Sequence, residues 1–361
     1  MAASTESGDA PAFLFATCQI GAEAALKAEL AREHAGFRFA YSRPGFLTFK
    51  LPGDFAPAPA FQLKSVFARA WGYSLGKVDA TSLDSAAASI AGRLVTGNYA
   101  ALHVWQRDMA AIGHRGFEPH VTPAALAAEE AIRRQSDVES VNTPPARAAE
   151  SGDLVLDCVL VEPHEWWIGQ HWANGGDTGH PGGVREISVP ENMVSRAYLK
   201  MQEALAWSGL PIKPGQTCVE VGCSPGGASQ ALLEHDLKVI GIDPAEVDAT
   251  VLANARFTHI RKRGADVRRK EFRGVHWLAA DMNVAPEYTL DTVEAIVTHE
   301  EVNIGGLLIT LKLLDWQLAA DLPRFLERVR SWGYHQVRAR QLPHNRQEVC
   351  VTGLRRKSRS S

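Results

Sequence analysis

A lysine closes one of the most apolar stretches of the chain. Residues 307–314 read LLITLKLL, so Lys312 stands near the end of a run that suits a strand buried on both faces. Two interpretations are open. A lysine at the rim of a sheet packs its stem and holds its amine in water, whereas a lysine kept partly desolvated can act as a base. The residues that the fold brings beside Lys312 decide between the two.

A glycine-bearing turn offers a site for a polar ligand. Residues 218–230, CVEVGCSPGGASQ, predict a strand, a tight turn and a helix start, where backbone amides can bind polar groups. The pattern is neither GxGxxG nor a phosphate-binding P-loop. Asp243 ends the next predicted strand, about 20 residues on, where a carboxylate can accept both hydroxyls of a ribose. Asp266 follows a short third strand and can approach an adenine amine. Alternatively, Asp243 caps a helix and Asp266 pairs within the basic stretch 261–273.

The C-terminal half alternates helices and strands, which is typical of a parallel α/β sheet. The closing pair of strands, YHQVRARQL and EVCVTGLR, has no helix between its members, so its last strand should be antiparallel. We therefore expect a Rossmann-like domain with a mostly parallel, seven-stranded sheet. Asp281 and Lys312 would end parallel strands, and Glu348 would begin the antiparallel one. With Lys200 on the helix before the sheet, all of these side chains can meet at its carboxyl edge.

The N-terminal half predicts two smaller α+β domains. In the first, FLFATC and FRFAYSRPGFLTFKL predict strands, and LKSVFARAWGYSLGKV predicts a helix that runs into a strand. In the second, Thr122 caps a helix, and LVLDCVLVE and EWWIGQHW predict two strands. The adjacent Trp166 and Trp167 would face opposite ways, one into the core and one toward the surface or a half-buried site. We expect a disordered tail at 1–11, domains at 12–80, 81–173 and 191–356, a linker at 174–190 and a basic tail at 357–361.

Composition indicates a soluble globular protein. The 361 residues are 45% hydrophobic and 22% charged, and the longest apolar runs are too short to cross a membrane. Five cysteines without a CxxC pair indicate a reducing cytoplasm and no structural zinc. A net charge of −3 does not by itself indicate a nucleic-acid-binding protein, although the stretch 261–273 and the tail RRKSRSS are basic.

Several motifs together resemble a known family. EVGCSPGG, VIGID, AADM and LLITLK, in this order, resemble the class I S-adenosylmethionine-dependent methyltransferases, and SRAYLK ahead of them is similar to the FtsJ-like ribose 2′-O-methyltransferases. That family carries a Lys-Asp-Lys-Glu tetrad, whose members match Lys200, Asp281, Lys312 and Glu348. FLFATCQIGAEAALKAEL, SVFARAWGYSLGKV and ARQLPHNRQEVCVTGLRR extend the resemblance to 23S ribosomal RNA cytidine 2′-O-methyltransferases with an N-terminal THUMP-containing region.

The resemblance implies a cofactor, a partner and a set of contacts. The cofactor would be S-adenosylmethionine, and the partner would be 23S-type ribosomal RNA or a ribosome assembly intermediate. Ser224 stands where the family favours cysteine, and Glu220 stands where many relatives have aspartate. The residues expected to contact the cofactor are Ser195, Glu220, Gly222, Ser224, Pro225, Gly226, Gly227, Asp243, Asp266 and Asp281.

The tetrad suits methyl transfer to a ribose hydroxyl. The 2′-hydroxyl needs to lose its proton, and a free lysine, with a pKa of about 10.4, is a poor base near neutrality. Burial and the neighbouring Lys200 cation would both disfavour the charged form of Lys312. Asp281 and Glu348 would hold the amines and the hydroxyl, at an opposing electrostatic cost. Positioning, with no metal required, should supply much of the acceleration.

Other functions remain possible from the sequence. An amino-methylating enzyme would carry an Asn/Asp-Pro-Pro-aromatic loop, whereas residues 281–287 read DMNVAPE. An RNA-binding protein with an inactive methylase domain and a dinucleotide oxidoreductase are further alternatives. The N-terminal half lacks a catalytic cluster, and we expect it to deliver RNA through basic and aromatic residues. These candidates are Arg69, Trp71, Arg107, Trp166 and Trp167.

Overall fold

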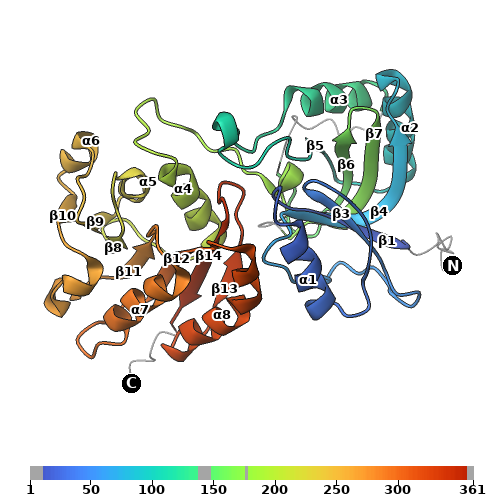
Figure 1. Cartoon of the computed structure of the whole chain (residues 1–361). Helices are drawn as coiled ribbons and strands as arrows, with labels where there is room; N and C mark the ends of the chain where they lie inside the picture. Colours follow the sequence, from blue (N-terminus) through green and yellow to red (C-terminus); the bar gives the residue numbers. More distant parts are fainter. Residues whose placement is uncertain (1–10, 137–147, 175–177, 356–361) are drawn as a thin grey trace, which may run out of the picture. The chain divides into compact units, whose positions relative to one another are not determined.

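The chain forms two compact units, residues 1–185 and 186–361, each built on one seven-stranded sheet (Figure 1). The computed structural model describes residues 11–136, 148–174 and 178–355. The expected tails at 1–11 and 357–361 therefore lie almost wholly outside the described residues. Among the described helices, none has both the length and the hydropathy that crossing a membrane requires.

The C-terminal unit has the predicted sheet. Its strand order is β10-β9-β8-β11-β12-β14-β13. Neighbours from β10 to β12 are parallel, whereas β14 is antiparallel to both β12 and β13. The predicted antiparallel last strand is thus confirmed. The strands are β8 (Thr217–Val221), β9 (Lys238–Ile242), β10 (Phe257–Ile260), β11 (Trp277–Ala280), β12 (Gly306–Lys312), β13 (Arg338–Arg340) and β14 (Glu348–Leu354).

Helices cover both faces of this sheet, with α4 and α5 on one face and α7 and α8 on the other (Figure 1). Their apolar stripes explain the positions: Met201 and Leu205 of α4 join Leu308 of β12 in one core, while Leu307 and Ile309 are fully buried on the opposite face. The strand is apolar on both faces because both are covered. The helices are α4 (Ala197–Ser208), α5 (Gly227–Glu234), α6 (Ala249–Leu252), α7 (Pro286–Val297) and α8 (Leu322–Ser331), with 3₁₀ turns at Gly264–Asp266, Arg269–Phe272 and Trp316–Asp321.

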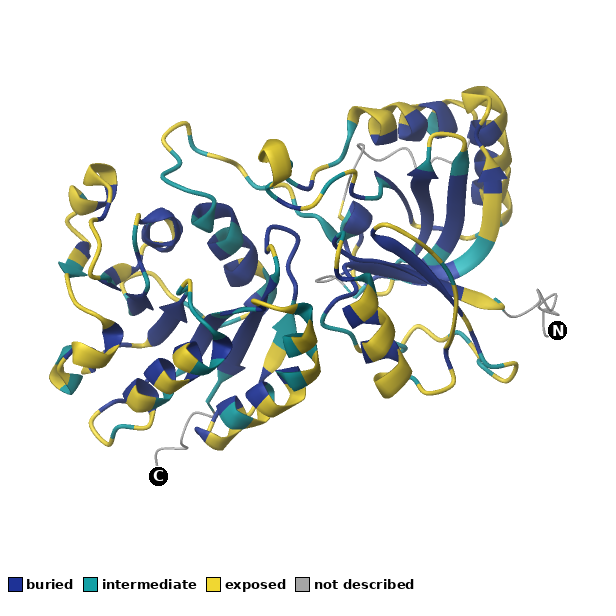
Figure 2. Ribbon diagram, viewed as in Figure 1, coloured by how far each residue is buried: buried dark blue, intermediate teal, exposed yellow. Residues whose placement is uncertain are grey.

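The N-terminal unit is a mixed sheet in the order β2-β3-β1-β4-β7-β6-β5, with only β5 and β6 parallel. Helices α2 and α3 pack together on one face, and their outer sides are exposed (Figure 2). The elements are β1 (Phe13–Thr17), α1 (Glu23–Glu33), β2 (Arg38–Arg43), β3 (Phe46–Lys50), β4 (Ala70–Asp79), α2 (Leu83–Thr96), β5 (Ala101–Gln106), α3 (Pro123–Arg134), β6 (Leu154–Glu162) and β7 (Glu165–Trp172), with 3₁₀ turns at His114–Gly116 and Pro181–Gly183.

The expected division at residue 80 differs from the structure. Strand β4, from the segment 12–80, pairs with β7, from the segment 81–173, so that Tyr73 faces Gln170 and Val78 faces Trp166. The two segments therefore share one sheet. Alternating side chains identify a strand but do not name its partner, which is why the sequence did not reveal this pairing.

Two local predictions in this unit also need correction. Residues 63–69 form no helix. The Glu29 carboxylate accepts hydrogen bonds from the backbone amides of Val66, at 2.8 Å, and Phe67, at 3.3 Å, and so holds the segment in an irregular conformation. Helix α2 was not anticipated, although Ser82 caps it by accepting a hydrogen bond from the Ser85 amide.

Within the predicted linker at 174–190, the residues that the structure describes from 178 onward contact one or the other folded unit. The carbonyl of Thr178 lies 2.9 Å from His171 Nε2 of β7. A Cβ on Gly183, where φ is +71°, would lie 2.4 Å from the Arg69 carbonyl, so glycine permits this close approach. Ile187 already packs against the core of the C-terminal unit. The boundary consequently falls at residues 185–186.

Candidate active site

The four tetrad side chains meet at the carboxyl edge of the C-terminal sheet. Lys312 is the last residue of β12 and Glu348 the first of β14, and the two are partners in the strand register. Asp281 follows the neighbouring strand β11, and Lys200 lies in the first turn of α4. Parallel strands end at one edge, and an antiparallel strand begins there, so the topology itself brings these groups together.

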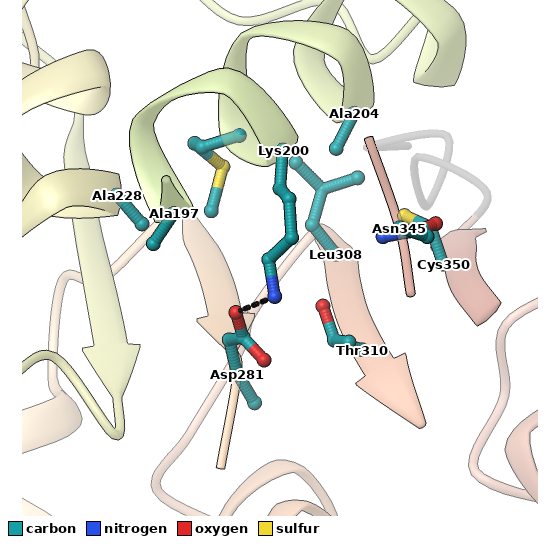
Figure 3. Close-up of a pocket in the computed structure, with 11 residues that line it drawn as sticks. Ala197, Lys200, Ala204, Ala228, Asp281, Leu308, Thr310, Asn345 and Cys350 are labelled. Carbon is teal, nitrogen blue, oxygen red and sulfur yellow. Dashed lines mark ion pairs between the residues drawn. The ribbon is translucent and has the colours of Figure 1, made fainter. Parts of the chain in front are cut away.

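The tetrad is a ring of alternating charges. Lys200 Nζ lies 3.0 Å from Glu348 Oε1, and Lys312 Nζ lies 3.0 Å from Asp281 Oδ1. Direct ion pairs between Lys200 and Asp281 and between Lys312 and Glu348 complete the ring. Side-chain exposure ranges from 4% at Glu348 to 18% at Lys312. Figure 3 shows Lys200 pointing from its helix toward Asp281. Two ammonium groups and two carboxylates give the buried ring no net charge.

The ring shifts the pKa of Asp281 and of Lys312. Burial alone would raise the pKa of Asp281, but the Lys200 and Lys312 cations lower it below its ordinary value. Burial alone would lower the pKa of Lys312, but the carboxylates of Asp281 and Glu348 outweigh burial and raise it. The sequence predicted the opposite direction for Lys312. The prediction was wrong because it gave the desolvation and the Lys200 charge more weight than two carboxylates in direct contact.

A short loop between β13 and β14 holds Glu348 in place. Asn345 Nδ2 donates to Glu348 Oε1 at 3.4 Å, and the Arg346 backbone amide donates to the same oxygen at 3.3 Å. Asn345 is itself fixed, because its Oδ1 accepts a hydrogen bond from the Leu342 amide at 2.9 Å. Glu348 is therefore aimed at both lysines by contacts from its own loop.

Helix α4 anchors that loop. The Glu203 carboxylate accepts the backbone N–H of His344 at 2.8 Å, and its other oxygen lies 2.8 Å from His344 Nδ1. Arg196 Nη2 donates to the His344 carbonyl at 3.2 Å. Glu203 and Arg196 lie three residues after and four before Lys200, on the same face of the helix. The roles of Glu203, His344 and Asn345 were not predicted, although the spacing of three residues between Lys200 and Glu203 places both on one helix face.

Glycine is required at the turn after β8. A Cβ on Gly222, where φ is +86°, would lie 2.9 Å from the Asp281 carbonyl, and one on Gly227 would lie 2.2 Å from Ser195 Oγ. Gly226 has a φ of +119°, and the Ser224–Pro225 peptide is cis. The turn therefore lies against Asp281, which follows β11, and against Ser195, which precedes α4.

Asp243 and Ser195 border this turn. Asp243 Oδ2 accepts the Ser224 amide at 3.2 Å, and its Oδ1 accepts the Ala245 amide at 2.8 Å. The carboxylate thus braces the glycine turn as well as its own loop. The Ser195 hydroxyl is buried and makes no hydrogen bond to any group that the structure describes. A buried hydroxyl of this kind beside a glycine cradle fits a polar ligand that supplies the missing partner.

Two other predicted cofactor contacts, Glu220 and Asp266, differ in their exposure. Glu220 is only 2% exposed and accepts a hydrogen bond from the Ser229 hydroxyl of α5. This contact joins the end of β8 to the helix that follows the glycine turn. Burial, together with the charges of Asp281 and Asp243, raises the pKa of Glu220 to about 8 despite that hydrogen bond. Asp266 is exposed in a 3₁₀ turn, and its side chain makes no ion pair within the described ranges.

A small cavity of about 20 Å³ opens beside the tetrad (Figure 3). Lys200 and Asp281 line it together with the polar Thr310 and Asn345, and the other lining side chains are apolar or cysteine. The stem of Lys200 therefore lies in apolar surroundings while its amine reaches the carboxylates. The apolar lining residues include Ala197, Met201, Ala204, Ala228 and Leu308.

The N-terminal residues proposed to contact RNA have structural roles instead. Trp71, Trp166 and Trp167 are 6%, 5% and 8% exposed, so none is a surface platform. The two adjacent tryptophans do face opposite ways, but both faces are packed, and each ring joins a different core. Arg69 pairs with Asp108 in the interior. The predicted stacking role of these side chains is therefore wrong.

Arg107, the fifth of these candidates, is also engaged within its own unit. Its Nε donates to the Val161 carbonyl at 2.5 Å, and its Nη2 lies 3.2 Å from Glu162 Oε1. The guanidinium therefore ties the end of β5 to β6.

A buried group of metal-binding residue types was not foreseen. Donor atoms of His103, Asp157 and His171 lie within 4.8 Å of one another in the N-terminal unit. His171 Nδ1 lies 2.6 Å from Asp157 Oδ2, and its Nε2 donates to the Thr178 carbonyl at 2.9 Å. Burial would lower the pKa of His171, but the Asp157 charge together with the hydrogen bonds to Asp157 and to the Thr178 carbonyl raises it. With both ring nitrogens engaged, this group joins β7 to the segment that follows it.

Comparisons with known proteins agree with the geometry. Residues 193–324 match the family described as FtsJ-like methyltransferase. The proteins called ribosomal RNA large subunit methyltransferase M from Azotobacter vinelandii and Alkalilimnicola ehrlichii are each 29% identical, over 47% and 48% of this chain. The chain spans about half the length of these relatives, 50% and 49%.

Solved structures are only distantly similar. TrmN from Thermus thermophilus aligns with 95% of this chain and 99% of its own, at 15% identity and a TM-score of 0.36. A fibrillarin pre-rRNA processing protein from Methanococcus jannaschii aligns with 62% of this chain and 88% of its own, at 13% identity and a TM-score of 0.37.

Proposed function

We propose that this chain is an S-adenosylmethionine-dependent ribose 2′-O-methyltransferase that modifies large-subunit ribosomal RNA, at a cytidine of 23S-type RNA. The observation that carries the proposal is the ring of Lys200, Asp281, Lys312 and Glu348 beside a glycine turn. The match of residues 193–324 to FtsJ-like methyltransferases supports the chemistry, and relatives named as large-subunit methyltransferases support the substrate.

The glycine turn would hold the cofactor. When bound, S-adenosylmethionine supplies a methyl group on a positively charged sulfur. Backbone amides of the turn and the Ser195 hydroxyl would bind its polar groups, and Asp243 would accept the ribose hydroxyls. Asp266 would lie toward the adenine amine. Gly222 and Gly227 let the turn pack closely against its neighbours, because a Cβ at either position would meet neighbouring atoms at 2.9 Å or less.

Lys312 would be the base for the 2′-hydroxyl. Its amine must first lose its own proton, and the raised pKa keeps most of it charged near neutrality. The reaction would then run through a small neutral fraction of Lys312, with the hydroxyl held against the ring by Asp281 and Glu348. Lys200 balances the two carboxylates. Positioning by this fixed ring would contribute much of the rate, and no metal is required.

The N-terminal unit would deliver the RNA. We propose that it is a THUMP-containing region in which a ferredoxin-like segment (12–80) and a THUMP-like segment (81–173) share one sheet. Basic residues at its surface would contact the RNA, because Arg69 and Arg107 are engaged within the unit. The substrate would be ribosomal RNA or an assembly intermediate. A cytoplasmic location would suit the five cysteines, each free and buried in the structure.

Mapping of ribose methylation tests the proposal. Ribosomal RNA from cells with and without this protein should differ at one 2′-O-methylated cytidine of the large subunit. Supplying the wild-type chain should restore the modification, and supplying Lys312→Ala should not. Identical methylation maps in the two strains would contradict the proposal.

A further inference from the structure

A second cavity lies at the opposite edge of the C-terminal sheet. Leu354 of β14 faces Gly306, the first residue of β12, so this edge is the far one from Lys312. The cavity measures about 420 Å³, within the range of small-molecule sites. Helix α4 runs 12 residues from the tetrad edge toward it, which is about 18 Å. The lining residues are Ser208, Gly209, Leu210, Arg330, His335, Gln336, Val337, Arg338, Thr352 and Leu354.

The wall of this cavity carries an unsatisfied hydroxyl. Thr352 is 2% exposed, and its Oγ1 makes no hydrogen bond to the groups that the structure describes. Ser208, which also lines the cavity, differs: its hydroxyl donates to the Leu205 carbonyl at 3.0 Å and accepts the Leu210 amide at 3.2 Å. Buried polar groups are nearly always bonded, so Thr352 marks a place where a ligand can supply a partner.

The rim of the cavity is basic. Arg338 Nη2 donates to the Ser208 carbonyl at 2.8 Å and to the Trp207 carbonyl at 3.3 Å, and its guanidinium lies 5.1 Å from the Trp207 ring. One face of a planar cation is therefore fixed on an aromatic ring. Arg330 and His335 are exposed at the rim, and the lining set contains no acidic residue. Arg330 Nη1 lies 3.2 Å from the Glu327 carboxylate on its own helix.

We propose that this cavity binds a nucleotide of the RNA substrate outside the methylation site. A base would stack on Arg338, since guanidinium planes stack well on bases, and a neighbouring phosphate would lie against Arg330. Thr352 and Gln336 offer hydrogen bonds to sugar or base edges. The inference rests on the proposed function, because it takes RNA as the substrate. An RNA strand that occupies both this cavity and the tetrad would lie along α4. Binding at the cavity would therefore help to fix which nucleotide reaches the tetrad.

Two substitutions separate the charge from the hydrogen bond, and both are tested in the full chain. Arg330→Gln should weaken binding of a ten-nucleotide single-stranded RNA about 3- to 10-fold and make the salt dependence shallower by about 0.7 in log–log slope. Thr352→Val should lower the affinity without changing that slope and without lowering the thermal midpoint. Arg324→Gln is the matched control on the same helix, because Arg324 contacts Glu287 and lies outside the cavity lining.

The same variants keep S-adenosylmethionine affinity unchanged, raise KM for ribosomal RNA and leave kcat intact. Wild-type RNA affinity and salt slope in both Arg330→Gln and Thr352→Val would overturn the inference. Cytidine 5′-monophosphate that binds in the cavity but is not displaced by RNA would also overturn it, since the ligand would then be a free nucleotide. If the wild type transfers no methyl group to RNA while both variants still weaken RNA binding, the proposed function fails and the cavity assignment stands.

Discussion

The pH dependence of methyl transfer follows from the charge ring. Because Asp281 and Glu348 raise the pKa of Lys312, the free enzyme holds this amine almost wholly as a cation at neutral pH. Even at an ordinary lysine pKa of about 10.4, roughly one amine in a thousand is neutral at pH 7.4. Each unit of pH then multiplies the neutral fraction about tenfold. We expect kcat/KM to rise about 100-fold between pH 7 and pH 9 without a plateau, since this quantity reports pKa values of the free enzyme.

The assay is the initial rate of transfer of a labelled methyl group to a ribosomal RNA fragment below KM, between pH 6.5 and pH 9. S-Adenosylmethionine affinity, measured by calorimetry over the same range, should stay constant and serves as the control. Lys312→Ala separates a lysine base from catalysis by hydroxide, because a hydroxide route would leave rate and slope largely unchanged in the variant. A flat profile would refute Lys312 as the base. A plateau that begins below pH 9 would refute the raised pKa.

Three other perturbations test the supports of the site. Asp243→Asn should weaken S-adenosylmethionine binding about 5- to 30-fold, because a charged acceptor is worth about 1–2 kcal/mol here; unchanged affinity in calorimetry would leave Asp243 a structural brace only. Gly227→Ala should lower the free energy of unfolding by about 1–3 kcal/mol, because its Cβ would overlap Ser195. Gly92→Ala, in open space on α2, should raise the free energy of unfolding by about 0.5–1 kcal/mol. Equal effects of the two substitutions on thermal unfolding would contradict the close packing of Gly227. Glu203→Gln should lower kcat about 10-fold with unchanged cofactor affinity, because the loop that carries Glu348 loosens; unchanged kcat would show that the loop holds its place without Glu203.

The C-terminal half was largely predictable from the sequence because its signals are local. The apolar strands, the glycine turn and the missing helix before β14 together predict a mostly parallel sheet, its antiparallel last strand and the edge where Lys312 and Glu348 meet. The loop anchor was harder to predict. Glu203 and His344 are 141 residues apart, and nothing in the local pattern of either residue names the other as its partner.

The N-terminal half was predicted less well because its pairings are long-range. Strands β4 and β7 carry ordinary alternating patterns, and their pairing decides that one sheet forms instead of two. Arg69 and Trp167 look like surface groups for RNA in the sequence. Their burial depends on partners from distant segments, such as Asp108 for Arg69. The predicted direction of the Lys312 pKa shift was wrong for a related reason. That direction depends on the distances between Lys312 and the carboxylates, and a sequence does not contain these distances.

Nucleoside analysis of the reaction product tests the central claim most directly. The purified full chain is incubated with S-adenosylmethionine bearing a deuterated methyl group and unmodified large-subunit ribosomal RNA, and the digested RNA is analysed by mass spectrometry. The label should appear in 2′-O-methylcytidine and be absent with Lys312→Arg, since guanidinium cannot give up its proton at accessible pH. Label on a base, or equal 2′-O-methylcytidine from Lys312→Arg, would contradict ribose methylation by this tetrad.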